Sequence, residues 1–298
     1  MAAHRRRVDE LLAHHPRRLA DGTDHPVWSF LSTYYSYRPA QLRRWHPGFG
    51  VVIPSAGGRY RDRSGYVEGT GGATVSAAHL RHRLDTIVFV HRLLAATASR
   101  PARLNCFGMH EWAMVYRADA EQIRHASVGL RLGGAGTDAV VESTELRCTH
   151  FDAFRFFTPA ARPINFSRSA DPRESLSLSR AGQIDDEQPG CVHAGMDLYK
   201  WAYKLTPLIE SELLVDALEL AFALRELDMR ASPYDLRHLG FAPIPVESPA
   251  GRAEYARRQA ELSQRAAIVR AALSDRCTRL IAVAQHVPGH VGAVVTGE

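Results

Sequence analysis

Residues 207–228 read PLIESELLVDALELAFALRELD, and apolar side chains fall on nearly every side of this stretch when it is wound as an α-helix. A helix that is apolar all round is buried in the core, because any face turned to water would expose hydrophobic surface. Thr206 and Pro207 stand in the order expected of a helix cap and a first helical residue, and Glu210 follows in the first turn. The stretch therefore predicts a central helix around which the rest of the chain packs.

Further helices are predicted on both sides of this central helix. Apolar residues recur at helical spacing in the segments 4–20, 77–94, 108–117 and 252–286. Composition typical of strands occurs within 127–157, where Gly133-Gly134 would form a turn, whereas residues 54–73 are predicted to form a long loop. We therefore expect a mainly α fold with a small β element, of the α+β class, built as one globular domain around the helix near 207–228.

The predicted domain organisation has a short N-terminal part and one large domain. Residues 1–25 form a basic N-terminal helix, residues 26–290 a single catalytic domain, and residues 159–190 a lid or surface loop. No run of about 18 or more apolar residues occurs, so we expect no membrane partner. The polar N-terminus is unlike a secretory signal, and four cysteines do not suggest a disulfide scaffold. We expect a cytoplasmic protein with free thiols, and the sequence leaves the oligomeric state open.

The distribution of positive charge is unusual. Of 37 lysine and arginine residues only two are lysines, Lys200 and Lys204, and both lie in the stretch CVHAGMDLYKWAYKLTP (191–207). At about 100° per residue, a helix places both lysines on one narrow stripe with Asp197 and His193. Either this stripe faces water, with Asp197 paired to a lysine, or it faces a buried pocket. The net charge of +5 permits a polyanionic partner but does not require one.

A second motif, CFGMHEWAMVYR (106–117), places His110 and Glu111 beside Trp112 in apolar surroundings. Adjacent positions on a helix diverge by about 100°, so we expect one of the two polar side chains to enter a site while the other supports it. The alternative is a half-buried histidine beside a surface glutamate. The second histidine of a HExxH zinc motif is missing.

A third motif, RCTHFDAFRFFTP (147–159), would place His150, Asp152 and Phe154 on one face if it forms a strand. A cysteine shortly precedes the histidine in all three motifs, although we expect the cysteines to be small buried side chains rather than ligands. Three histidines with a carboxylate suit Zn²⁺ or Fe²⁺ with an open coordination position. The possible metal ligands are His110, His150 and His193.

Two other segments are rich in charged residues. TYYSYRPAQLRRWHPG (33–48) interleaves aromatic and arginine side chains, as a nucleic-acid groove does, but core aromatics with solvated arginines fit it equally well. LDMRASPYDL (227–236) ends the central helix with Asp228, Arg230 and Asp235, and we expect local capping or ion pairs there.

Together, the motifs TYYSYRPAQLRRWHPG, CFGMHEWAMVYR, THFDAFRFFTP, PGCVHAGMDLYKWAYKLTP and LDMRASPYDL resemble an actinobacterial family catalogued as 3-methyladenine DNA glycosylases. The resemblance extends from about residue 26 to 260 and carries over no catalytic residue. The chain has neither the hairpin of helix-hairpin-helix glycosylases nor the repeat, about 40 residues long, of the HEAT-repeat type.

The resemblance implies a DNA repair hydrolase that cleaves the N-glycosidic bond of alkylated purines such as 3-methyladenine, with DNA or a nucleotide-like molecule as its substrate. In this hypothesis a carboxylate activates water, and Lys200 binds phosphate or, with a depressed pKa, attacks the sugar. The expected catalytic residues are Glu111, Asp152, Asp197 and Lys200. The expected substrate-binding residues are Trp112, Tyr199, Trp201, Lys204, Arg43, Arg44, Trp45 and Asn105.

Two alternative functions remain open from the sequence. One is a metal-dependent enzyme acting on a small molecule, with the three histidines holding Zn or Fe. The other is a non-enzymatic nucleic-acid-binding protein that uses the segment 28–50.

Overall fold

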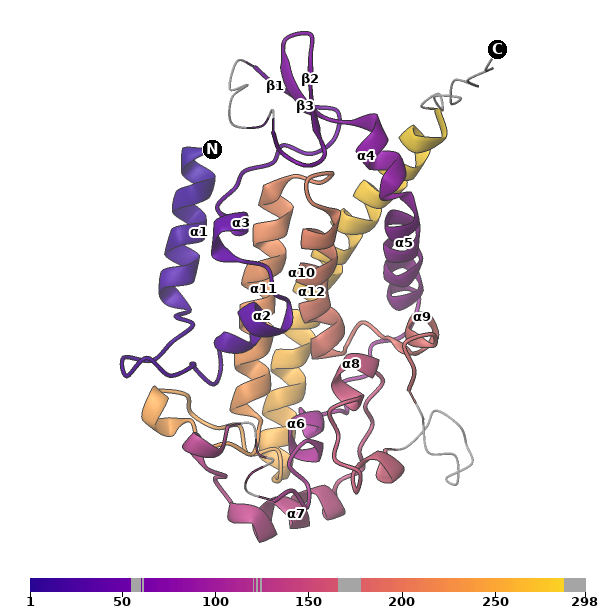
Figure 1. Ribbon diagram of the computed structural model, residues 1–298. Coiled ribbons are helices and arrows are strands. Elements are labelled where there is room, and N and C mark those ends of the chain that lie inside the picture. Colours follow the sequence, from indigo (N-terminus) through magenta and orange to yellow (C-terminus); the bar gives the residue numbers. More distant parts are fainter. Residues whose placement is uncertain are drawn as a thin grey trace, which may run out of the picture.

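Two antiparallel helices, α10 (Val192–Leu205) and α11 (Ser211–Arg230), pack along each other in the middle of the molecule (Figure 1). The structure is a computed structural model that describes residues 1–54, 60, 62–119, 121, 123, 125–165 and 178–286. Gly195 allows the two helices to approach closely, because a Cβ at this position would lie 2.6 Å from Leu224 Cδ1. The mainly α fold with a small β element is as predicted.

The central helix α11 is buried on most of its surface, as its apolar sequence predicts. Its start was predicted wrongly, because the Thr206–Pro207 peptide bond is cis and the helix begins at Ser211 with Glu210 as its N-cap. Cis prolyl bonds occur in tight turns, and here the turn joins α10 to α11.

The long helix α12 (Pro249–His286) packs against α11 and against α5 (Leu84–Ala98), which confirms the predicted C-terminal helix. Its buried residues recur at helical spacing, from Tyr255 to Leu280. The helix predicted over 77–94 is divided into two helices. Helix α4 spans Ala77–His82, α5 begins at Leu84, and Arg83 lies between them.

The β element lies in the N-terminal third, where a loop was predicted. Strands β1 (Val52–Ile53), β2 (Tyr66–Gly69) and β3 (Gly72–Val75) form an antiparallel sheet in the order β1-β3-β2. Gly72 has a φ of +141° and passes so close to Ile53 that no side chain would fit, so glycine here marks a tight hairpin rather than a loop. Residues 55–59 and 61 of the predicted loop lie outside the described residues.

The strands predicted within 127–157 are absent from the structure. Gly133 begins helix α7 (Gly133–Ser143) with a φ of +65°, so the Gly-Gly pair starts a helix instead of a turn. The third motif forms the short helix α8 (Phe151–Phe154), and the strand alternation expected for His150 and Asp152 is therefore wrong.

The remaining elements surround the central pair (Figure 1). Helix α1 (Ala2–His14), which corresponds to the predicted basic helix, packs on α11, where Arg7 pairs with Asp216 and Glu219. Within 159–190, residues 166–177 are not described. No described helix has the length and apolar character needed to cross a bilayer. The short helices are α2 (Ser29–Tyr34), α3 (Pro39–Leu42), α6 (Met109–Ala113), α9 (Gln183–Asp186) and the 3₁₀ turns Ala126–Val128, Arg162–Ile164 and Arg237–Leu239.

We predict that acidification destabilises the fold through His46, which joins the sheet to the start of α11. Its backbone pairs with Ser211, its ring lies 2.8 Å from the Tyr66 hydroxyl, and burial lowers its pKa from 6.5 to about 4. Because the folded state takes up this proton less readily than the unfolded chain, stability present above pH 6.5 falls as the pH approaches 4. The loss by pH 4.5 is about 2 to 3 kcal/mol.

Urea unfolding at pH 7 and pH 4.5 measures this effect. The variant His46→Gln is expected to lose less stability than the wild type between these two pH values. An unchanged pH dependence in the variant would show that His46 is not the group responsible.

Candidate functional site

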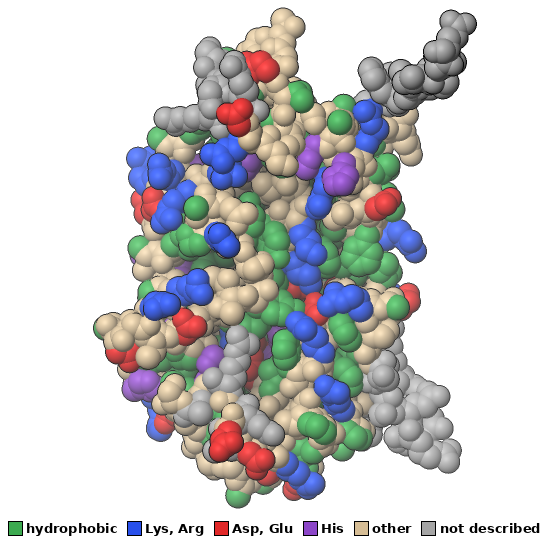
Figure 2. All heavy atoms as spheres, in the orientation of Figure 1, with side chains coloured by type: hydrophobic (Ala, Val, Ile, Leu, Met, Phe, Trp, Pro, Cys, Tyr) green, Lys and Arg blue, Asp and Glu red, His purple; other side chains and the backbone are tan. Residues whose placement is uncertain are grey.

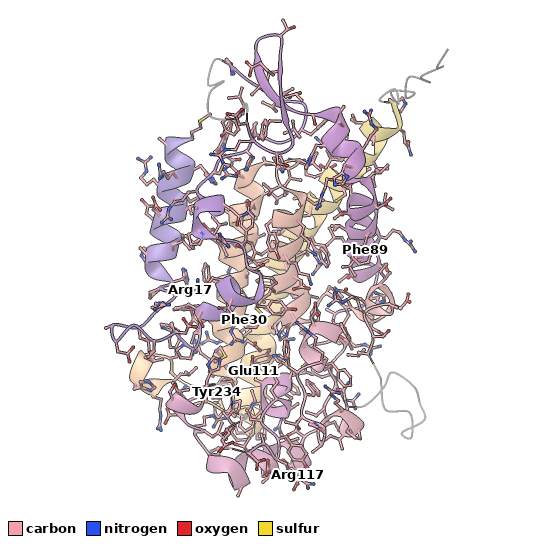
Figure 3. The ribbon with its side chains drawn as sticks, viewed as in Figure 1. Arg17, Phe30, Phe89, Glu111, Arg117 and Tyr234 are labelled. Atoms are coloured by element: carbon pink, nitrogen blue, oxygen red, sulfur yellow. The ribbon has the colours of Figure 1, made fainter. Side chains whose placement is uncertain are left out.

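A cavity of about 160 Å³ opens between α2, α6, α8 and α10, close to the end of α11. Figure 3 shows three of its lining residues, Phe30, Glu111 and Tyr234, lying together although they come from distant parts of the sequence. Aromatic rings form much of the wall, and charged groups reach the same space. The lining residues are Phe30, Tyr34, Glu111, Met114, His125, Asp152, Phe156, His193, Arg225 and Tyr234.

The first charged group of the site is centred on Arg225, a buried arginine of α11. Its Nη1 donates to Glu111 Oε1 at 2.7 Å and to Asp228 Oδ2 at 3.2 Å, and Asp228 Oδ1 lies 2.6 Å from His110 Nε2. Burial alone would raise the pKa of Glu111, but the guanidinium of Arg225 outweighs it and lowers that pKa. Burial opposes protonation of His110, yet Asp228 raises its pKa well above the usual value.

The second charged group is centred on Lys200, one of the two lysines of the chain. Its Nζ donates to Asp197 Oδ2 at 2.7 Å and to Asp152 Oδ2 at 3.0 Å, so a buried ammonium joins α10 to α8. Tyr35 donates to the other oxygen of Asp197 at 3.0 Å. Burial would lower the pKa of Lys200, but the two carboxylates raise it, and the ammonium in turn keeps the pKa of Asp197 below its usual range.

His150 lies behind this second group. Its Nε2 is 3.3 Å from Glu187 Oε1 and 3.4 Å from Asp197 Oδ2. Burial works against protonation, but the two carboxylates raise the pKa of His150 to about 9.

His193 connects the two groups and lines the cavity. Its ring centre lies 4.4 Å from that of His110 and 5.4 Å from that of His150. Burial and the neighbouring His110 lower the pKa of His193, so this imidazole is neutral at pH 7. Its Nδ1 is buried without a hydrogen-bond partner among the described residues.

The three histidines predicted as metal ligands therefore converge, but they divide between two sets of possible ligands. His110 and His193 lie with Asp228, and His150 lies with Glu187 and Asp197. In each set the ligand atoms are within 4.8 Å of one another and all three residues are buried. Mixed imidazole and carboxylate ligands suit a divalent first-row metal ion.

The predicted catalytic residues lie at two depths. Glu111 and Asp152 line the cavity, whereas Asp197 and Lys200 are buried behind it. The alternative in which this stripe faces water is wrong for His193, Asp197 and Lys200, and Lys204 alone of the four is exposed. A raised pKa also contradicts a nucleophilic amine at Lys200, since that role requires the neutral form.

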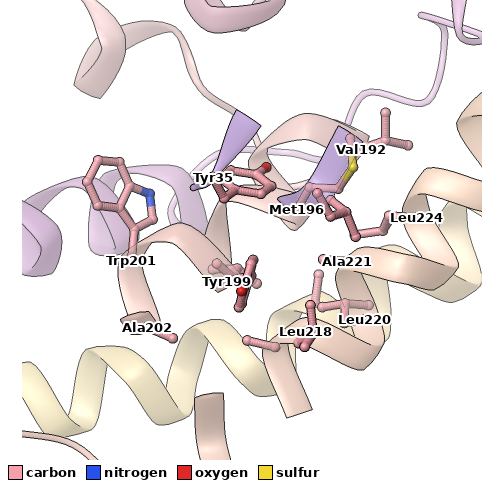
Figure 4. Close-up of a cluster of buried hydrophobic side chains, with 14 of the residues drawn as sticks. Tyr35, Val192, Met196, Tyr199, Trp201, Ala202, Leu218, Leu220, Ala221 and Leu224 are labelled. Atoms are coloured by element: carbon pink, nitrogen blue, oxygen red, sulfur yellow. The ribbon is translucent and has the colours of Figure 1, made fainter. Parts of the chain in front are cut away.

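The aromatic residues predicted to bind substrate are core residues. Trp112 is fully buried and its indole N–H donates to the carbonyl of Ala231. Tyr199 and Trp201 belong to the buried cluster of α10 and α11 drawn in Figure 4. None of the three lines the cavity, because their side chains fill space between helices instead.

The polar residues predicted to bind substrate also lie outside the cavity. Asn105 and Lys204 are exposed, and the Lys204 Nζ lies 5.3 Å from the centre of the Trp201 ring. Arg43, Arg44 and Trp45 line a separate, open depression of about 710 Å³ next to the start of α1.

The sequence interpretation missed Arg225, Asp228 and Glu187 as members of the site. Asp228 was expected to form a local cap or ion pair, and it does pair with Arg225 three residues earlier, but it also contacts His110, 118 residues away. A usable signal was the pair Arg225 and Asp228, because charges three residues apart in a helix that is otherwise apolar must find partners in the core. The aromatic wall residues carried no such signal.

We predict that Lys200→Met destabilises the protein by about 3 to 5 kcal/mol, because it leaves two buried carboxylates without their ammonium. Lys204→Met, one turn further along the same helix, is the matched control and should cost no more than about 1 kcal/mol. Urea denaturation of both variants tests this difference. Equal losses in the two variants would contradict a buried structural role that is specific to Lys200.

Comparisons with models of known protein families, with curated proteins and with solved structures found nothing that matches this chain. The function must therefore be argued from the chemistry of the site.

Proposed function

We propose that the protein hydrolyses the N-glycosidic bond of an alkylated purine such as 3-methyladenine in DNA. The observation that carries this proposal is a small cavity with aromatic walls, lined by the buried carboxylate of Glu111, whose Oε2 has no hydrogen-bond donor among the described residues. The resemblance of the five sequence motifs to an actinobacterial glycosylase family supports the same activity.

The cavity suits one flat base better than a whole nucleotide. Its volume of about 160 Å³ is below the range of roughly 300 to 1,000 Å³ that accommodates drug-sized ligands. Phe30, Tyr34 and Tyr234 line the cavity, and aromatic walls of this kind are used by enzymes that hold a base rotated out of the duplex. Alkylated purines such as 3-methyladenine carry positive charge while attached to the sugar, and both aromatic faces and carboxylates attract such a cation.

Glu111 has the charge state needed for the reaction. Its Oε1 is bound to Arg225, and no described residue donates to its Oε2. The lowered pKa keeps the carboxylate ionised, so Glu111 would position and activate water and stabilise the positive charge that develops on the sugar. A cationic purine is a good leaving group and needs no general acid.

The surface near Asp152 is suited to a phosphate backbone. Arg155 and Arg180 both contact Asp152, but their side chains are 42% and 61% exposed. Figure 2 shows further basic side chains on the same face of the molecule, over α10 and along α1. Positive charge in this position would hold DNA over the cavity through contacts that weaken with salt.

Release of 3-methyladenine from alkylated DNA, followed by chromatography, tests the proposed activity. We expect release by the wild type under single-turnover conditions. Absence of release at high enzyme concentration would refute the proposal, and salt-dependent DNA binding without release would favour the non-enzymatic alternative.

We predict that Glu111→Gln lowers the single-turnover rate by about 10² to 10⁴-fold, since the amide cannot take a proton from water. Glu226→Gln is the matched control, because Glu226 is 42% exposed and pairs with Arg230 on the same helix as Arg225. Thermal unfolding of each variant checks that the fold is kept. A rate within threefold of the wild type for Glu111→Gln would exclude Glu111 as the catalytic carboxylate.

A further inference from the structure

Three potential metal ligands meet at buried positions next to Lys200. His150 Nε2 lies 3.3 Å from Glu187 Oε1 and 3.4 Å from Asp197 Oδ2. For a tetrahedral ion with bonds of 2.0 to 2.2 Å, neighbouring ligand atoms stand about 3.3 Å apart. The two contacts of His150 Nε2 therefore match this spacing, and the ligand atoms of all three residues lie within 4.8 Å of one another.

The orientation of His150 supports a shared ion over ordinary hydrogen bonds. Its ring is 1% exposed, yet neither Nδ1 nor Nε2 has a hydrogen-bond partner among the described residues. Nε2 instead makes longer contacts with the two carboxylates. Buried polar atoms are nearly always satisfied, so an imidazole in this state is suited to bind a ligand such as a metal ion.

Both carboxylates are held in place from the outside. Gln183 donates to Glu187, and Tyr35 and Lys200 donate to the two oxygens of Asp197. Donors behind the ligating groups are the usual support of a metal site, because they fix the orientation of each ligand.

The charged side chains around the three ligands are also compatible with a bound cation. Asp152, Glu187 and Asp197 are buried carboxylates, whereas the buried fixed cations facing them are Lys200 and Arg270. Arg155 and Arg180 reach Asp152 only from the surface. The three carboxylates thus outnumber the two buried cations that face them.

The neighbouring set of His110, His193 and Asp228 is less suited to an ion. There His110 Nε2 and Asp228 Oδ1 already form a direct contact of 2.6 Å, which leaves less space for an ion between them than the 3.3 and 3.4 Å contacts of His150.

We propose that His150, Glu187 and Asp197 bind one divalent first-row metal ion. With three protein ligands, the ion keeps a coordination position open. This site does not depend on the glycosidase activity proposed above, because it rests on a different set of residues and is tested by binding alone.

Zn²⁺ alone is the probe. The full chain is prepared without a histidine tag, treated with chelator and dialysed, and Zn²⁺ binding is measured by titration calorimetry. The expected result is one ion per chain and a melting temperature that rises with Zn²⁺, because the ion binds the folded state. Failure of the wild type to bind Zn²⁺ at 0.1 mM would overturn the proposal.

Two variants locate the ion. His150→Gln and Glu187→Gln should each weaken Zn²⁺ binding by at least about 100-fold. Replacing a residue that only hydrogen-bonds to a metal ligand already lowers metal affinity by roughly 10 to 100-fold, and loss of the ligand itself should cost more. Glu187→Gln keeps the shape and the acceptor for Gln183, so it is expected to fold if His150→Gln does not. Circular dichroism checks both.

Two control variants test whether other histidines bind the Zn²⁺ ion. His82→Gln removes an exposed histidine of α4, and His193→Gln removes a ligand of the neighbouring set; both should keep the affinity within about threefold. Affinity that survives Glu187→Gln, or that is lost in His193→Gln and kept in His150→Gln, would overturn the assignment of this site.

Discussion

The requirement that every buried charge have a partner organises this molecule more strongly than any other constraint. Arg225 and Lys200 are cations on the two central helices, and each holds two carboxylates that come from different parts of the chain. Removing one partner from such a set exposes the others to an uncompensated desolvation penalty of several kcal/mol. The short helices α6 and α8 are thereby fixed against α10 and α11, and the cavity is the space left between them.

The same pairing sets the protonation states on which any chemistry in the cavity depends. Glu111 and Asp152 are ionised because a cation adjoins each of them, whereas His193 is neutral because burial, together with the charged imidazole of His110, lowers its pKa. Aromatic rings line the same cavity. Acidic, basic and apolar groups thus surround a volume that would hold little more than one heterocyclic ring.

The sequence was informative where one physical signal dominated. The uniform apolar character of 207–228 predicts a core helix whatever surrounds it, and the rare lysines drew attention to α10, where Lys200 is buried. The sheet was missed because Gly72 permits a tight hairpin in a stretch whose composition is typical of a loop. Trp112 and Trp201 were assigned to substrate because large aromatic residues in cores and in binding sites look alike in a sequence. Asp228 and Glu187 could not be placed in the site, since the histidines that they contact, His110 and His150, lie far away along the chain.

The site is assembled from segments that are widely separated in the chain. Glu111 and Arg225 are 114 residues apart, and the carbonyl of Val27 accepts from Arg225 across 198 residues. Contacts between such distant segments carry an entropic cost, since a long loop must be closed before the contact stabilises anything. During synthesis, the histidine and glutamate of α6 leave the ribosome long before α11 supplies their counter-charges. A chain interrupted ahead of α11 would therefore keep these polar groups in water, and its N-terminal half would have no reason to close around them.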